Sequence, residues 1–97
     1  MDLNYLDNIA LQIRARVPAS NLPDDDVRGL FRIYAVLLLA KGVAVAPEDV
    51  HNAWAAWMIE KDSTHEAIVP FSALPRDVAL EDTLYAEAIR IAAEMMS

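Results

Sequence analysis

Apolar residues recur at helical spacing in four stretches of the chain. Within each stretch they lie three and four positions apart, the period that places side chains on one face of an α-helix. This pattern predicts helices over residues 3–16, 24–41, 47–61 and 78–96. We therefore expect an all-α fold, a small four-helix domain that uses residues 1–97 as a single unit.

Proline, glycine and acidic residues indicate where these helices begin and end. Pro23 followed by Asp24–Asp26 is typical of a helix start, with proline near the first position and acids where they favour the helix dipole. Pro47 opens the third helix in the same way, and Gly42 fits a left-handed cap after the second. Asp77 can cap the last helix.

The segment between the last two helices has a different character. Residues 62–75 carry two prolines and show no helical period. We expect an ordered loop there, with at most a short turn of helix or strand.

The charge of the chain disfavours several classes of partner. Eight Lys and Arg residues stand against fifteen Asp and Glu, which gives a net charge of −7. Such a charge repels phosphate backbones and anionic lipid surfaces, so we expect neither nucleic acid nor membrane as a partner. The longest uncharged stretch, residues 33–40, is far short of the roughly 20 residues that span a bilayer. Without cysteine or a signal-peptide pattern, we expect a cytoplasmic protein.

Catalytic and metal-binding patterns are not evident. The four serines have no triad-like setting, and two glycines are too few for a phosphate-binding loop. The acidic residues group near predicted helix starts, where capping and the helix dipole explain them without a metal. We expect no catalytic residues, no metal site and no cofactor.

A set of residues after position 50 follows an order found in a known family. The residues are His51, Trp54, Thr64-His65, Val69-Pro70-Phe71, Leu74-Pro75 and Asp82. Over residues 47–85 this order resembles the ryanodine-receptor repeat (RyR domain) family, as a shortened bacterial or phage-type relative. The resemblance implies a binding module. It also implies a purine-type ligand, because a paired repeat domain of the channels accommodates an adenine nucleotide.

Five of these residues are candidates for a ligand site. They are His51, Trp54, His65, Phe71 and Asp82. In the functional interpretation, the two imidazoles meet an anionic ligand and one indole ring lines a cleft. The packing interpretation, which we favour, leaves His51 half exposed and lets His65 hydrogen-bond the loop backbone. It places Trp54 and Trp57 in the core, where each ring buries about 150–250 Å².

The sequence leaves more than one function open. We expect a non-catalytic protein-interaction adaptor, inhibitor or subunit in a bacterial or phage setting. The second predicted helix carries Tyr34, Leu37, Leu38 and Leu39, more apolar surface than one helix face buries, which favours a homodimer with these residues at the interface. The alternative is a small-molecule binder, a sensor or sponge for a nucleotide-like ligand. A purely structural subunit is a third option.

Overall fold

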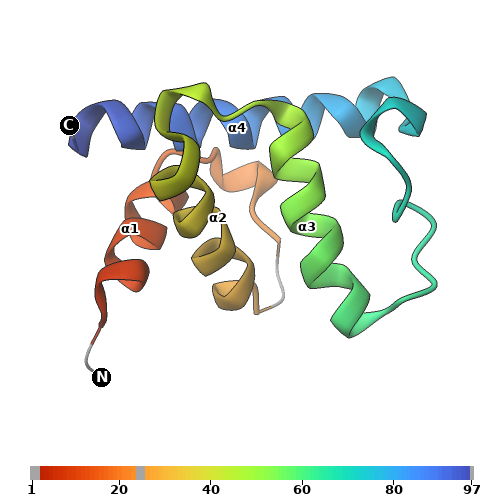
Figure 1. Ribbon diagram of the computed structural model, residues 1–97, viewed down its shortest axis with the longest axis horizontal. Coiled ribbons are helices and arrows are strands. Elements are labelled where there is room, and N and C mark those ends of the chain that lie inside the picture. Colours follow the sequence, from red (N-terminus) through yellow and green to blue (C-terminus); the bar gives the residue numbers. More distant parts are fainter. Residues whose placement is uncertain (1–2, 24–25, 97) are drawn as a thin grey trace.

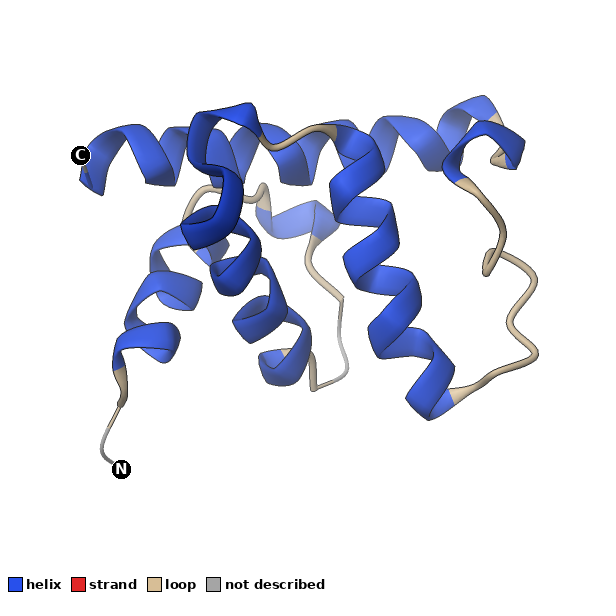
Figure 2. Cartoon of the chain, viewed as in Figure 1, coloured by secondary structure: helices blue, strands red, loops and turns tan. Residues whose placement is uncertain are grey.

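The chain folds into helices joined by short connections. The computed structural model describes residues 3–23 and 26–96. The α-helices in these ranges are α1 (Tyr5–Arg14), α2 (Arg28–Lys41), α3 (Pro47–Lys61) and α4 (Arg76–Met96). The short 3₁₀ helices are η1 (Ala19–Asn21), η2 (Gly42–Ala44) and η3 (Phe71–Ala73). The described ranges contain no strand, so the predicted all-α fold with four helices is confirmed (Figure 2).

Helix α4 is the element on which the others pack. In Figure 1 it runs along the whole length of the molecule, and α1, α2 and α3 lie beneath it on one side. Its inner face carries small residues between larger ones, which lets the other helices approach closely; these buried residues are Tyr85, Ala86, Ala88, Ile89 and Ala92. None of the helices in the described ranges is both long and apolar enough to cross a membrane.

Three aromatic rings form the centre of the contact between α2 and α4. The centroid of Phe31 lies 5.4 Å from that of Tyr34, nearly edge to face, and 6.0 Å from that of Tyr85. Tyr34 and Tyr85 are 5.7 Å apart. The Tyr85 hydroxyl donates a hydrogen bond of 2.8 Å to the carbonyl of Asn21, so η1 is also attached to this cluster. Edge-to-face and tilted rings at these distances attract one another beyond their burial.

Local capping explains the starts of α1 and α3. The Asn4 side chain accepts a hydrogen bond from the Asp7 amide at 2.8 Å and begins α1. At α3 the Asp49 carboxylate reaches back to the Ala46 amide at 2.8 Å and pairs with Lys41 at 2.9 Å. The predicted bounds of α3 are those observed.

Three predicted helix starts differ from those observed, and the first of these helices, α1, begins at Tyr5 rather than at residue 3. Helix α2 begins at Arg28 rather than at 24, because the Asp26 side chain accepts from the Arg28 amide at 3.1 Å in a turn that ends there. Asp24 and Asp25 lie outside the described residues. Helix α4 already begins at Arg76, so Asp77 is in its first turn rather than at its cap.

The residues expected at a dimer interface divide between core and surface. Tyr34 and Leu38 are buried within the single chain, so they are not available to a partner. Leu37 is half-buried, and Leu39 is 54% exposed. Helix α2 therefore buries more of its apolar surface than its sequence suggested, because both α1 and α3 pack beside it.

The two glycines provide a matched test of the helix ends. Gly42 has φ 54° and ψ −126°, a region almost restricted to glycine, so Gly42→Ala is expected to lower the free energy of unfolding by about 1–3 kcal/mol. Gly29 lies in α2, and a methyl group there would meet the Trp57 ring at an ordinary contact distance of 3.5 Å. Gly29→Ala is expected to raise the free energy of unfolding by about 0.5–1 kcal/mol. Urea denaturation of both variants measures the difference, and equal effects would contradict this account.

Candidate functional site

A cavity of about 550 Å³ lies among η1, α2, α3, the 62–70 loop and α4. Its volume is in the range of small-molecule sites, roughly 300–1,000 Å³. Four aromatic side chains contribute to its walls: Tyr34, Trp54, Trp57 and Tyr85. Among its polar lining residues are Ser20, His51, His65, Glu66, Glu81 and Asp82. Mostly apolar walls with a few convergent polar groups are typical of ligand sites.

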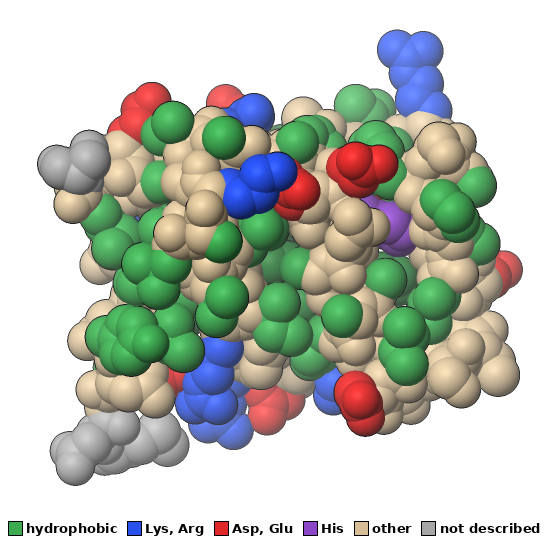
Figure 3. Space-filling view, viewed as in Figure 1, with side chains coloured by type: hydrophobic (Ala, Val, Ile, Leu, Met, Phe, Trp, Pro, Cys, Tyr) green, Lys and Arg blue, Asp and Glu red, His purple; other side chains and the backbone are tan. Residues whose placement is uncertain are grey.

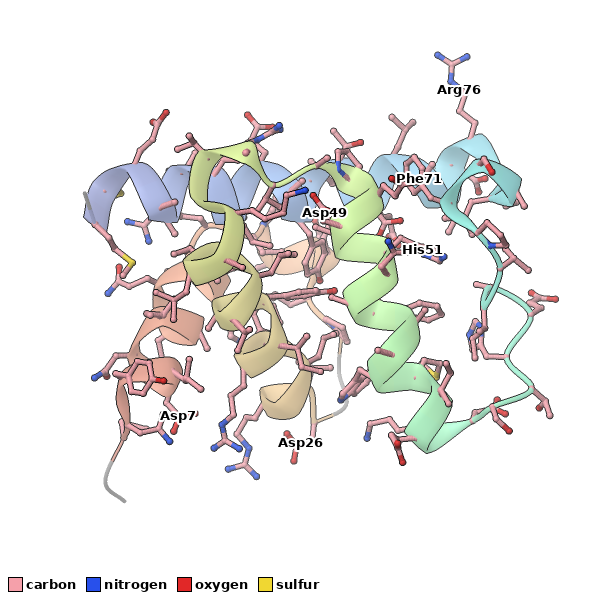
Figure 4. All side chains as sticks on the ribbon, in the orientation of Figure 1. Asp7, Asp26, Asp49, His51, Phe71 and Arg76 are labelled. Carbon is pink, nitrogen blue, oxygen red and sulfur yellow. The ribbon has the colours of Figure 1, made fainter. Side chains whose placement is uncertain are left out.

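His51 is buried and holds the 62–70 loop against α3. Its side chain is only 3% exposed, and its Nε2 lies 2.6 Å from the carbonyl oxygen of Val69. Because a carbonyl can only accept, Nε2 carries the hydrogen and donates it. The ring stacks on Trp54 at 5.8 Å and meets Phe71 at 6.2 Å. Figure 4 shows His51 and Phe71 close together, one from α3 and the other from η3.

In this arrangement the Oδ2 atom of Asp82 receives no hydrogen bond from the described residues. Its Oδ2 lies 3.8 Å from Nδ1 of His51, which is longer than a hydrogen bond. That oxygen is buried and accepts no hydrogen bond within the described part of the chain. Burial raises the pKa of Asp82 from 3.8 to about 6, although attraction to His51 opposes the rise. An ionised carboxylate here therefore costs free energy in the folded protein.

His65 joins the loop to the aromatic wall. Its Nδ1 accepts a hydrogen bond from the Ala67 amide at 3.0 Å, and its ring meets Trp54 edge to face at 5.1 Å. The loop before it is held by Asp62, whose carboxylate accepts from both the amide and the hydroxyl of Thr64. These local bonds fix the loop as one side of the cavity.

The structure brings the five candidate residues into one cluster. Four of them line the cavity: His51, Trp54, His65 and Asp82. Phe71 packs on His51 but does not line the cavity. His51 was expected to be half exposed and is instead buried, because the loop folds back over it. Both tryptophans are half-buried at the edge of the core, so they pack and line the cavity together.

Sequence reasoning did not assign several lining residues to the site. Tyr34 and Tyr85 look like core residues from their helical spacing, and they are buried, yet each also lines the cavity. Glu66 and Glu81 are exposed and also line the cavity. The cavity lies at the boundary between the core and the surface. The spacing of apolar residues along a helix does not show where such a boundary lies.

Comparison with protein families identifies the chain. Residues 4–94 match a family described as a domain of unknown function (DUF7701). The protein belongs to this family. No curated protein and no solved structure matches the chain.

The resemblance to the ryanodine-receptor repeat is therefore wrong. The matching family covers nearly the whole chain, including the first 45 residues, and nothing points to that repeat. Local chemistry explains the motif that suggested it. Thr64 and His65 form hydrogen-bonded turns, and Pro70 leads into η3. The bacterial or phage setting and the purine ligand were implied by that resemblance and lose this support.

The pKa of Asp82 leads to a prediction about stability. Between pH 3.8 and about 6 the folded protein keeps a proton that the unfolded chain has released, so Asp82 lowers stability as the pH rises through this window. Asp82→Asn is expected to stabilise the protein at pH 7 by up to about 3 kcal/mol and to have little effect below pH 4. Urea denaturation at several pH values measures this dependence.

Asp49 provides a control of opposite sign. Hydrogen bonds from Ala46 and Lys41 hold its pKa below the ordinary value, so its contribution to stability is present above pH 3.8 and is lost on further acidification. Asp49→Asn is expected to cost about 0.3–1 kcal/mol at pH 7. If both variants destabilised the protein equally at pH 7, Asp82 would not be a buried carboxylate without a partner.

Proposed function

We propose that the protein is a non-catalytic binding module that takes up a small molecule in the cavity between α2, α3 and α4. The observation that carries this proposal is the buried carboxylate of Asp82 on the wall of an aromatic cavity, without a hydrogen-bond partner among the described residues. A ligand with a donor group would supply the missing partner.

The energetics of Asp82 support a binding role. A buried polar group without a partner costs about 1–3 kcal/mol, and packing alone gives no reason to keep it. Groups that weaken the free protein in this way cluster at functional sites, where a ligand recovers the cost. Asp82 lines a cavity and has a raised pKa, which also indicates a functional site.

The geometry gives no support to acid–base catalysis. His51 is the buried histidine next to Asp82, but its Nε2 hydrogen is already donated to the carbonyl of Val69. The ring thus holds the loop in place through Nε2, and its other nitrogen, Nδ1, faces the Asp82 carboxylate at 3.8 Å. Among the described residues no three His, Cys, Asp or Glu side chains form a group that could hold a metal.

Binding of small molecules by this cavity can be tested directly. Saturation-transfer NMR with indole, phenethylamine, adenosine and adenosine monophosphate, each at about 1 mM, is expected to detect at least one bound compound in the parent protein. Ser20 lines the cavity from the surface, so Ser20→Trp is expected to block it and remove the signal.

Ser72→Trp is the matched control. Ser20 and Ser72 are each the middle, exposed residue of a three-residue 3₁₀ helix, but Ser72 does not line the cavity. Binding should persist in this variant. No signal in the parent, or equal loss in both variants, would rule out the cavity as the binding site.

A second candidate function is binding of a protein partner, with a second copy of the chain as the partner. Val36 and Leu39 on α2 and Val43 on η2 are each more than half exposed. Figure 3 shows hydrophobic side chains spread over the face formed by α1, α2 and α3. Exposed apolar side chains grouped on one face favour association.

Sedimentation tests this second candidate. At micromolar concentration we expect a species of twice the 10.8 kDa chain mass. Leu39→Glu should convert it to the monomer, because a charge would be buried at the interface. Leu80→Glu is the control, since Leu80 on α4 is 56% exposed, close to the 54% of Leu39. A parent protein that sediments only as a monomer would exclude the homodimer.

A further inference from the structure

We propose that the ligand of the cavity is an organic cation: a protonated amine carried on a compact aromatic or aliphatic body. This inference rests on the proposed function and adds the charge and chemical class of the ligand. Three independent features support it, namely the charges around the cavity, the unpartnered carboxylate and the aromatic walls.

The charge around the cavity selects for a cation. The described residues that line it include three acidic side chains, Glu66, Glu81 and Asp82, and no Lys or Arg. The net charge of −7 attracts cations over a longer range as well. The acidic lining and the net negative charge would both repel a phosphate or carboxylate ligand. Among the described lining residues, only His51 and His65 could bind its negative charge.

The Asp82 carboxylate supplies the specific contact. Its Oδ2 is buried and accepts no hydrogen bond from the described residues, and Nδ1 of His51, which carries no hydrogen in the neutral ring, lies 3.8 Å away. A primary ammonium brings three hydrogen-bond donors and a positive charge. In a partly buried site such a charge-assisted hydrogen bond is stronger than a neutral one.

The aromatic walls suit the rest of such a ligand. Tyr34, Trp54, Trp57 and Tyr85 line the cavity, and ring faces attract both cations and flat apolar groups. The protein already uses one of these rings in this way, since the Lys61 ammonium lies 4.7 Å from the centroid of Trp57. A metal ion would instead need several oxygen or nitrogen ligands, and the described residues offer no such group.

Three compounds with the same phenyl body separate charge from shape. They are phenethylamine, 3-phenylpropanamide and 3-phenylpropionate, which carry an ammonium, a neutral amide and a carboxylate. Isothermal titration at pH 7.5 is expected to show phenethylamine binding about tenfold or more tightly than the amide, with the carboxylate weakest.

Asp82→Asn tests the contact, and Asp77→Asn is its control. Asp77 is exposed, lies on the same helix and does not line the cavity, so the two variants change the net charge equally. Asp82→Asn is expected to weaken phenethylamine about tenfold or more and to leave the amide within about threefold. Asp77→Asn should leave both affinities unchanged. Circular dichroism of each variant checks that it is folded.

The pH dependence provides a third measurement. Asp82 faces His51 on α3 and lies beside Glu81 on α4. The other titratable groups around the cavity are Tyr34, Tyr85, His65 and Glu66. Because burial raises the pKa of Asp82 to about 6, phenethylamine binding should weaken about tenfold from pH 7.5 to 5. An anionic ligand would instead bind more tightly on acidification, because it would no longer face the negative charge of Asp82.

The outcomes separate this inference from the proposed function. If indole or the amide binds in a manner blocked by Ser20→Trp, but the amine binds no better, the cavity is a ligand site and the cation inference is wrong. Equal weakening by Asp82→Asn and Asp77→Asn would also overturn it, because nonspecific attraction would then explain the binding. If no compound binds the parent protein, both proposals fail.

Discussion

Phe31, Tyr34 and Tyr85 pack between α2 and α4, and this aromatic contact organises both the core and the candidate site. These rings join the two helices at the centre of the core, and the Tyr85 hydroxyl extends the contact to η1. Tyr34 and Tyr85 also line the cavity. The core and the candidate site therefore share a wall, so the packing of the core determines the position of that wall.

The other side of the cavity depends on a single buried histidine. His51 donates to the carbonyl of Val69 and packs between Trp54 and Phe71, and these contacts hold the 62–70 loop in place. The same placement leaves the Oδ2 of Asp82 without a hydrogen bond from the described residues, because the imidazole nitrogen that faces it is 3.8 Å away. His51 thus holds the loop closed and leaves the Oδ2 of Asp82 without a donor from the described residues. We propose that the ligand supplies this donor. A rigid aromatic wall facing a carboxylate that still needs a donor is a simple arrangement for selective binding.

The helices could be predicted from the sequence because their signals are local. Apolar spacing gave the four helices, and Pro47 with its acidic neighbours gave the bounds of α3. The start of α2 could not be placed in this way, because proline and acids are compatible both with a first turn and with the loop before it; the bond from the Arg28 amide to Asp26 selects the later start. The short order of residues after position 50 pointed to five side chains that do gather, although the family it suggested is wrong. Turn-forming residues recur in unrelated proteins because local hydrogen bonding favours them.

Four properties could be predicted from composition or from spacing within one segment: the fold class, the approximate helices, the acidic character and the absence of thiol chemistry. Packing between distant segments was needed to show that His51 is buried, that the Oδ2 of Asp82 has no donor among the described residues, and that Tyr34 and Tyr85 line a cavity as well as the core. It also decided that Leu39 is exposed on α2 while Leu38 is not. These properties depend on which distant segments of the chain pack against a residue. The spacing of apolar residues in a single helix does not show which segments those are.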